Sequence, residues 1–228
     1  MFGKQKKKRK ICDSMKPNQK MYDEMGNQVL LYPSTLINIT QSVNGQLSHM
    51  GVTSIDDNGG ATNISQFYAP CDLKLVMIMD WAENPLIWQS INPVRLADNS
   101  VSHITIRNMH QDDISMFSVG DIYLQGQPWV EEGNAGFSTG NHVHLEVIKG
   151  HTTTLKLSPQ GKYSLGLYGI DQNPDSYFHA NDVTSINQVG VPLNFIEYTG
   201  ETTSPGESVE RNVSMLHAMV CKAFPFNF

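Results

Sequence analysis

The sequence has 228 residues, of which 39% are hydrophobic and 17% charged, and its formal net charge at pH 7 is −6. This length suits one large domain or one domain with extensions, and the acidic balance argues against a general polyanion binder. No apolar run is long enough to span a bilayer. The 18 glycines and 11 prolines favour a turn-rich β protein over a helical one.

Cysteine content and the start of the chain bear on the cellular compartment. Cys12, Cys71 and Cys221 lie far apart and are odd in number. We therefore expect free, reduced thiols and neither a disulfide framework nor a cysteine-type zinc site. The first residues lack the apolar core of a signal peptide, so we expect no secretion route encoded there.

A compact basic run occupies Lys4 to Lys10. Such runs bind nucleic acid, act as a nuclear address, or form either a solvated, mobile tail or a docking peptide for an acidic partner. No stacking aromatic residues accompany this run, so we favour the tail and predict no nucleic-acid partner.

The first predicted strand follows an irregular stretch at 11–34 and covers residues 36–43, where apolar and polar residues alternate. Asn44-Gly45 then signals a hairpin. After it come His49 and, before a Gly-rich turn, Asp56, which together can supply one nitrogen and one oxygen to a metal ion. Taken alone this pairing is weak, because acidic residues before a turn often cap it.

The middle of the chain predicts further strands. Residues 68–79 form a turn and an apolar strand, and residues 101–110 form an alternating strand that ends in a histidine. Between them, residues 80–100 are expected to be a hairpin or surface loop. Its Trp81 and Trp88 can line a groove or pack in the core.

The most informative stretch runs from Gly136 to Val147 and reads Gly-Phe-Ser-Thr-Gly-Asn-His-Val-His-Leu-Glu-Val. Side chains two residues apart point to the same face of a strand. His142 and His144 are therefore expected to project together, while Val143 and Leu145 turn towards a core. Two imidazoles on one strand can share the work around a cation, one as ligand and the other as proton donor or hydrogen-bond donor.

The rest of the chain is less specific. We expect strand-like pieces at 152–157, 163–168 and 191–198, a linker at 200–208, and a short apolar end at 215–228. The last of these is interpreted as a small helix with an aromatic tail that docks on the body or on another chain. Four histidines, at 103, 151, 179 and 217, are expected to be surface or packing residues.

The order of these signals resembles a known family. The signals are His49-x-Gly51, a following Asp, Ala69-Pro70-Cys71-Asp72, a strand ending in His110, Val119-Gly120-Asp121, and the block from Gly136 to Glu146. Over about Gly45 to Lys149 the chain is similar to the lysostaphin- or LytM-like zinc metallopeptidases, the M23 family of peptidoglycan endopeptidases. The Ser-Thr-Gly-Asn-His-x-His-x-Glu block is the most specific part.

The resemblance implies a site. His49, Asp56 and His144 would bind one zinc ion, and His110 and His142 would be the catalytic pair. One departure stands out, because the family's usual spacing is His-x-x-x-Asp and the fourth residue after His49 is Thr53.

Two explanations compete for this spacing. Either the loop bulges so that Asp56 still reaches the metal, with Asp57 as the fallback ligand, or the site is degenerate. We favour the intact site because His110, His142 and His144 are all present. The longer spacing resembles that of lysins on the tails of some short-tailed phages of Gram-positive hosts.

The resemblance also implies a fold and a domain organisation. We expect a mainly β protein, with an antiparallel β-sheet and a narrow groove over the metal site. The peptidase domain would cover residues 35–200, between a basic, irregular arm at 1–34 and a linker with an apolar tail at 201–228. The loop at 80–100 and the residues after Gly150 would form the groove walls.

The expected function is hydrolysis of peptide bonds in peptidoglycan stem peptides or cross-bridges by a zinc endopeptidase. The lysin-like spacing favours a phage tail-tip protein, found in the virion or at the host cell wall, with the two terminal extensions contacting tail proteins. Alternatives are an endolysin for host lysis and a catalytically degenerate fold that binds cell wall or a partner.

Overall fold

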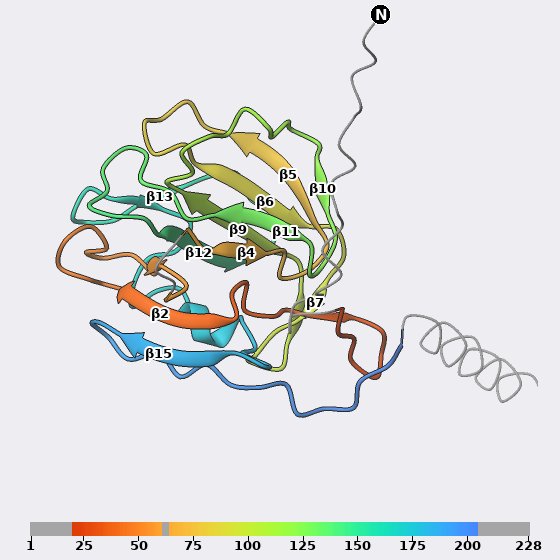
Figure 1. The fold of residues 1–228 in the computed structure, drawn as a ribbon. Helices are drawn as coiled ribbons and strands as arrows, with labels where there is room; N and C mark the ends of the chain where they lie inside the picture. The colour runs from red at the N-terminus through yellow and green to blue at the C-terminus, as the bar shows by residue number, and fades with distance from the viewer. Residues whose placement is uncertain (1–19, 61–63, 205–228) are drawn as a thin grey trace, which may run out of the picture.

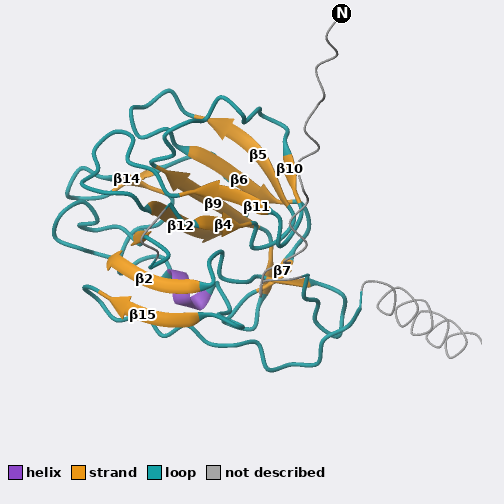
Figure 2. Ribbon diagram, in the orientation of Figure 1, coloured by secondary structure: helices purple, strands orange, loops and turns teal. Residues whose placement is uncertain are grey.

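A computed structural model describes residues 20–60 and 64–204, which form short β-strands and long loops (Figures 1 and 2). The largest sheet has eight strands in the order β10-β5-β6-β9-β12-β3-β2-β15. Their bounds, in the same order, are Ile122–Tyr123, Leu73–Ile78, Leu86–Ser90, Ile104–Met109, Val143–Lys149, Ile55–Asp57, Leu36–Gln41 and Thr184–Gln188. All neighbouring pairs are antiparallel except β2 and β15, which are parallel. The prediction of a mainly β fold is confirmed.

Smaller sheets complete the molecule. One contains β1 (Gln28–Val29), β7 (Val94–Arg95) and β8 (Val101–Ser102), and two others pair β4 (Gln66–Tyr68) with β11 (Pro128–Glu131) and β13 (Lys156–Leu157) with β14 (Tyr163–Ser164). A short 3-10 helix, Pro174–Ser176, is the only helix in the described residues. Nothing in these residues forms a helix with the length and hydropathy needed to cross a membrane.

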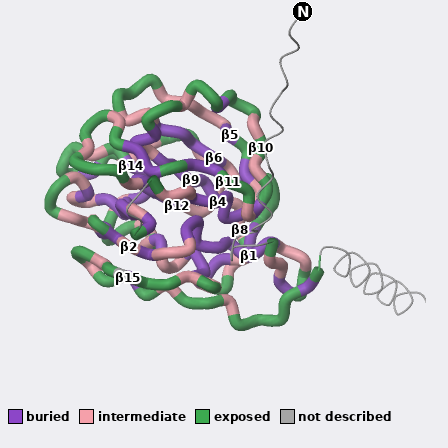
Figure 3. Tube along the Cα trace, viewed as in Figure 1, coloured by how far each residue is buried: buried purple, intermediate pink, exposed green. Residues whose placement is uncertain are grey.

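The core lies between one face of the large sheet and the β4–β11 pair, and Figure 3 shows the buried chain segments gathered there. Alternation on β12 turns Val143, Leu145 and Val147 into this core, as predicted for the first two. Trp88 of β6 packs edge-on against Trp129 of β11, with ring centroids 5.5 Å apart. Burial of such large side chains is the main force holding the two layers together.

The opposite face of the large sheet, here called the site face, carries polar residues. His144 and Glu146 of β12 point to it, and their antiparallel partners are Met109 and Arg107 of β9. On the other side of β12, His144 is paired with Asp56 of β3. The strand order β9-β12-β3 therefore places residues far apart in sequence side by side.

The loop prediction for residues 80–100 is corrected in part. Leu86–Ser90 is a central strand of the large sheet, and Trp88 is fully buried. The two prolines misled the prediction, because Pro85 and Pro93 flank this strand and do not interrupt it. Trp81 remains exposed in a turn before the strand.

The prediction of a strand at 191–198 is wrong. These residues form a loop, and the strand of this part of the chain lies earlier, at Thr184–Gln188. Pro192 has no N–H to donate to a ladder. The N–H of Leu193 donates to the side chain of Gln188 at 2.8 Å, which holds the segment as a loop on the core.

The described end of the predicted N-terminal arm packs within the body. β1 pairs with β7, and Leu30 and Tyr32 are fully buried in the core. The domain boundaries themselves stay predictions. The basic run at 4–10 and the apolar end at 215–228 lie outside the described residues.

Candidate metal and catalytic site

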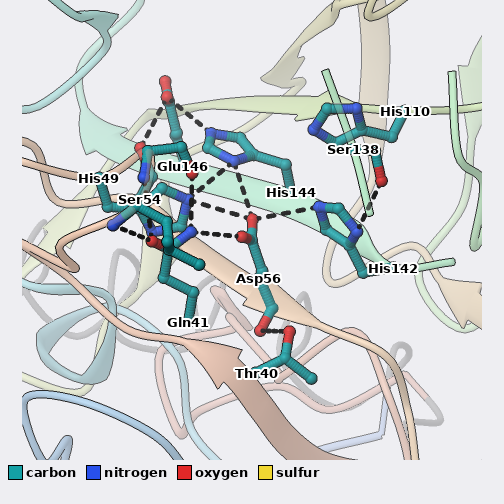
Figure 4. A network of polar contacts seen from close by, with 12 residues as sticks. Thr40, Gln41, His49, Ser54, Asp56, His110, Ser138, His142, His144 and Glu146 are labelled. Atoms are coloured by element: carbon teal, nitrogen blue, oxygen red, sulfur yellow. Dashed lines mark hydrogen bonds and ion pairs between the residues drawn. The ribbon is translucent and has the colours of Figure 1, made fainter. Parts of the chain in front are cut away.

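The five residues predicted to form the site come together on the site face, where β9 ends and β12 begins. Figure 4 shows His49, Asp56 and His144 pointing toward one another, with His142 and His110 beside them. His49 lies in the turn between β2 and β3, His142 immediately before β12, and His110 immediately after β9. Their roles stay predictions, but their convergence is a property of the fold.

Three ligand atoms form a compact triangle. His49 Nε2 and His144 Nδ1 are 3.2 Å apart, and Asp56 Oδ1 lies 3.1 Å from the first and 2.9 Å from the second. Zinc bonds of about 2.0–2.1 Å in tetrahedral geometry would separate ligand atoms by roughly 3.3 Å. Because all three residues are buried and the distances match, the donor set fits a small divalent ion such as zinc.

The tautomers leave the correct nitrogens free for a metal. His49 Nδ1 lies 3.0 Å from the Ser42 carbonyl oxygen, which can only accept, so Nδ1 carries the hydrogen and Nε2 presents a lone pair. His144 Nε2 lies 3.0 Å from Glu146 Oε1 and donates to it, which leaves Nδ1 free. This carboxylate–histidine pairing is the usual support of a metal-binding imidazole.

Asp56 is held as an anion. Burial alone would raise its pKa, but His49, His142 and His144 hold the pKa well below its usual range. Its second oxygen, Oδ2, accepts from Gln41 Nε2 at 2.9 Å, so Oδ1 is turned to the histidines.

Asp57, the fallback ligand, points elsewhere. Its carboxylate accepts from Tyr32 Oη at 2.6 Å and from the N–H of Gly59 at 2.9 Å. Burial raises the pKa of Asp57 to about 6. Successive side chains of a strand point to opposite faces of the sheet, so only one of the two aspartates can reach the triangle of ligand atoms.

The structure shows how the long spacing is accommodated. Val52 pairs with Leu167, and the N–H of Thr53 donates to the Gly166 carbonyl oxygen at 3.1 Å. Residues 52 and 53 thus pair with the segment after β14. Asp56 returns to the site on β3, as the intact-site explanation requires.

His110 and His142 flank the triangle on one side. Their ring centroids are 4.6 Å apart. His110 Nδ1 donates to the Ala135 carbonyl oxygen at 2.7 Å, and His142 Nδ1 donates to that of Gly140 at 2.8 Å. His110 Nε2 is therefore left for proton exchange, whereas His142 Nε2 lies 3.4 Å from Asp56 Oδ1.

The backbone of His110 is strained, with φ of 76°, a left-handed conformation that favours glycine. Its N–H donates to the Glu83 carbonyl oxygen at 2.7 Å, and its own carbonyl accepts from the N–H of Ala135 at 3.2 Å. Strain maintained by such surrounding bonds is typical of functional residues.

The pKa values of the two imidazoles are shifted in opposite directions. Burial lowers the pKa of His110 to about 4, so this ring is neutral at pH 7. Burial also lowers the pKa of His142, but Asp56 outweighs it and raises that pKa. A dication bound to Asp56 would oppose the rise, since like charges disfavour protonation.

A buried polar network supports His144, and the sequence analysis assigned it no role. Glu146 accepts from His144, from Arg107 Nη2 at 2.6 Å and from Ser54 Oγ at 2.9 Å, and its other oxygen accepts from the N–H of Leu165 at 2.8 Å. Burial alone would raise the pKa of Glu146, but Arg107 and His144 lower it below its ordinary value.

Strand alternation from His144 could have placed Glu146 on the site face, whereas no local signal pointed to Gln41.

Two hollows open on either side of the histidines. One, here called the arginine hollow, has a volume of about 280 Å³ and includes Trp81, Glu83, Arg107, Lys162 and Tyr163 in its lining. The other, the loop hollow, has a volume of about 300 Å³ and includes residues 138–142, Asp56 and Leu47 in its lining. Ser48, His110 and Phe137 line both, so the two hollows adjoin beside the triangle, and together they are here called the groove.

The remaining histidines lie outside this cluster. His103 and His151 have ring centroids 4.2 Å apart at the ends of β8 and β12, and His179 is buried beside Tyr198. His217 is outside the described residues.

Comparison with known proteins gives partial matches. No protein-family model matches the sequence. The chain is 32% identical over 192 residues to Morphogenesis protein 1 of Bacillus phage B103, an alignment that covers 82% of this chain and 48% of that protein. The chain thus spans about half the length of this relative.

Two solved structures overlap with part of the fold. A zinc containing peptidase from Vibrio cholerae has a TM-score of 0.39 and 20% identity, covering 59% of this chain and 42% of that one. A putative peptidase M23 from Pseudomonas aeruginosa has a TM-score of 0.33 and 19% identity, covering 52% and 44%. With both TM-scores below 0.5, any functional conclusion rests on the site itself.

Proposed function

We propose that this chain is a zinc-dependent endopeptidase of the lysostaphin-like type that hydrolyses peptide bonds in peptidoglycan stem peptides or cross-bridges. The observation that carries the proposal is the triangle of His49, Asp56 and His144 with two further imidazoles beside it. Three protein ligands leave a coordination position for solvent or substrate, which distinguishes catalytic from structural zinc sites.

The chain's residues have separable tasks in this proposal. His49, Asp56 and His144 would hold one zinc ion, which when bound supplies a Lewis acid that polarises the scissile carbonyl and lowers the pKa of water. His110 and His142 present their Nε2 atoms beside the groove, and that of His142 also lies 3.4 Å from Asp56 Oδ1. Each can accept the proton of the attacking water, return it to the leaving amine, or donate to the developing oxyanion.

The groove suits an extended peptide. The groove consists of both hollows, and the exposed side chain of Phe137 lines each of them. An extended strand laid in it would place one peptide bond over the triangle and its neighbours in the two hollows. Stem peptides and cross-bridges of the cell wall are extended and accessible in this way.

The test combines metal content with chemistry. Wild type is expected to bind one zinc ion and to release new amino termini from purified cell walls, and a chelator should stop the release. His144→Ala and Asp56→Ala should lose the metal, whereas Asp57→Asn should retain it. His110→Ala and His142→Ala should retain zinc and lose about 10²-fold or more in rate.

A specific result would refute the proposal. Full zinc occupancy in Asp56→Ala would remove Asp56 from the site. Zinc bound stoichiometrically by wild type without any new amino termini would favour the alternative of a wall-binding or partner-binding protein with a dead site.

We further propose that the protein acts in a phage particle, as a tail-tip lysin that opens the wall during DNA entry. The support is the similarity to a phage morphogenesis protein together with the lysin-like spacing. Mass spectrometry of purified virions should detect the chain, and its loss on deleting residues 1–19 or 205–228 would identify the docking segment. Detection only in lysates, and never in virions, would favour the endolysin alternative.

A further inference from the structure

Arg107, on the floor of the arginine hollow, has hydrogen-bond donors that the chain does not satisfy. Its Nη2 donates to Glu146 Oε1 and, at 2.8 Å, to the Tyr163 carbonyl oxygen. Its Nε and Nη1 are buried and have no partner among the residues that the structure describes. The residue is only 1% exposed. Buried donors are rarely left unpaired, so these two nitrogens point to an acceptor supplied by a ligand.

The walls of the arginine hollow favour an acceptor attached to an apolar stem. Trp81 is 40% exposed and Tyr163 is 55% exposed, and their ring centroids are 6.3 Å apart. Exposed aromatic side chains at the mouth of a pocket offer flat apolar surface at low entropic cost. The loop hollow has no Trp or Tyr in its lining, and its exposed aromatic residue, Phe137, lines both hollows.

The charges of the arginine hollow select the kind of acceptor. The charges of Arg107 and Glu146 cancel each other. The floor therefore attracts a ligand through the unpaired N–H groups of Arg107 rather than through a net charge. Lys162 adds a positive charge to the lining and Glu83 adds a negative one. A carboxylate is the acceptor that best matches unpaired guanidinium N–H groups, because the hydrogen bonds are charge-assisted.

We infer that the arginine hollow is a carboxylate subsite for the peptide substrate. The carboxylate accepts from one of the two unpaired Arg107 donors, Nε or Nη1, which lie on opposite edges of the guanidinium; Lys162 assists, and the stem that bears the carboxylate packs on Trp81 and Tyr163. This inference rests on the proposed function, since it places substrate in the groove. The carboxylate comes either from the C-terminus of a peptide or from an acidic side chain.

The test varies the ligand first, which avoids any effect of mutation on folding. Four short alanine-rich peptides are compared by calorimetry on the full chain. One pair differs only in a free C-terminal carboxylate or its amide, and the other pair has blocked ends and differs only in an internal Glu or Gln. In one pair the acid should bind at least about tenfold more tightly than its neutral partner, as one charge-assisted bond would give, and that pair identifies the source.

Variants then assign the effect to the arginine hollow. Lys162→Gln should reduce the preference for the acid severalfold, and Lys74→Gln, a change at an exposed lysine of β5, should leave it unchanged. Arg107→Lys should abolish the preference. If Arg107→Lys does not fold, the Lys162 comparison still decides.

The outcomes separate this inference from the proposed function. Equal binding of acid and amide in both pairs would overturn the carboxylate subsite and mean that Nε and Nη1 are merely hydrated, even if the protein cleaves cell walls. A clear preference for the acid in a protein that releases no new amino termini would retain the subsite and reject the endopeptidase.

Discussion

At the scale of single residues, the site depends on the contacts that hold each candidate ligand side chain in one orientation. Asp56 and Asp57 are neighbours in the chain, yet one faces three imidazoles and the other faces Tyr32. The same control acts on His144, whose free nitrogen is fixed by the hydrogen bond from its other nitrogen to Glu146. Ligand orientation is therefore set by residues that would not touch the metal.

Removing the support of His144 should weaken metal binding. We expect Glu146→Gln to lower zinc affinity by about 10- to 100-fold, because the outer partner of a ligating histidine fixes its tautomer and basicity. The variant should also unfold more easily, since it leaves the Arg107 charge buried without its partner, at a cost of up to about 3–5 kcal/mol. Competition with a chromogenic chelator measures the first effect and urea unfolding of the metal-free chain measures the second.

Ser54→Ala is the matched control for this prediction. It removes only one neutral donor to Glu146 and leaves the ion pair intact. Ser54→Ala should lower the free energy of unfolding by about 1 kcal/mol and leave the zinc affinity little changed. Equal zinc affinity in wild type and Glu146→Gln would show that His144 needs no such support.

At the scale of elements, the site is assembled by the adjacency of β9, β12 and β3. One glycine, Gly133, contacts both the residue after β9 and the residue before β12. Gly133 is bonded through both its N–H and its carbonyl to His142, at 3.2 Å each, and it lies against the backbone of His110. This glycine therefore sits between the two residues proposed to move protons.

Adding a side chain at Gly133 should disturb catalysis and spare the metal. A Cβ there would overlap the His110 carbonyl oxygen and come within 2.8 Å of the Asp112 nitrogen. Because backbone cannot yield as a flexible side chain does, Gly133→Ala should shift His110 and lower the rate by about 10²-fold, the size of one lost catalytic group. Rates and zinc content are measured on the same preparations.

The control for this change is Gly140→Ala, in the loop before β12. A Cβ at Gly140 meets nothing within 4 Å, and neither glycine has a positive φ. Gly140→Ala should therefore stay close to the wild-type rate. If Gly133→Ala also kept the wild-type rate, the close approach to His110 would be irrelevant to function.

At the scale of the whole molecule, the small β1–β7–β8 sheet is joined to the large sheet by Asp98 and Lys149. Lys149 ends β12, and Asp98 lies in the turn after β7 and pairs with it. Although burial alone would raise the pKa of Asp98, Lys149 and Ser100 lower it to about 2. A carboxylate whose pKa is lowered by folding stabilises the fold above its unfolded pKa of about 3.9 and stops doing so as pH falls towards 2.

This linkage predicts a pH-dependent difference. Metal-free Asp98→Asn should be less stable than wild type at pH 7 by up to about 1 kcal/mol, the upper range for a partly exposed pair. The difference should shrink between about pH 4 and pH 2 as Asp98 in wild type becomes protonated. Urea midpoints at pH 7, 4 and 2.5 measure it, with the exposed Asp80→Asn as the control. A constant difference at all three pH values would contradict the linkage.

Features that depend on local periodicity and on the order of motifs could be predicted from the amino-acid sequence. Alternation of residues around His144 predicted which side chains of β12 enter the core, and composition predicted a β protein. The order of motifs predicted the five residues that the fold brings together. These features could be read because a strand's side-chain direction is set by its own backbone.

Only the tertiary structure decided what depends on strands that are distant in sequence. The choice of Asp56 over Asp57, the central strand at Trp88 and the support from Gln41 and Arg107 all follow from which strands pair and in which register. A shift of one residue in that register would turn every side chain to the other face. Such pairing is set by packing of the whole core, which no short stretch of sequence contains.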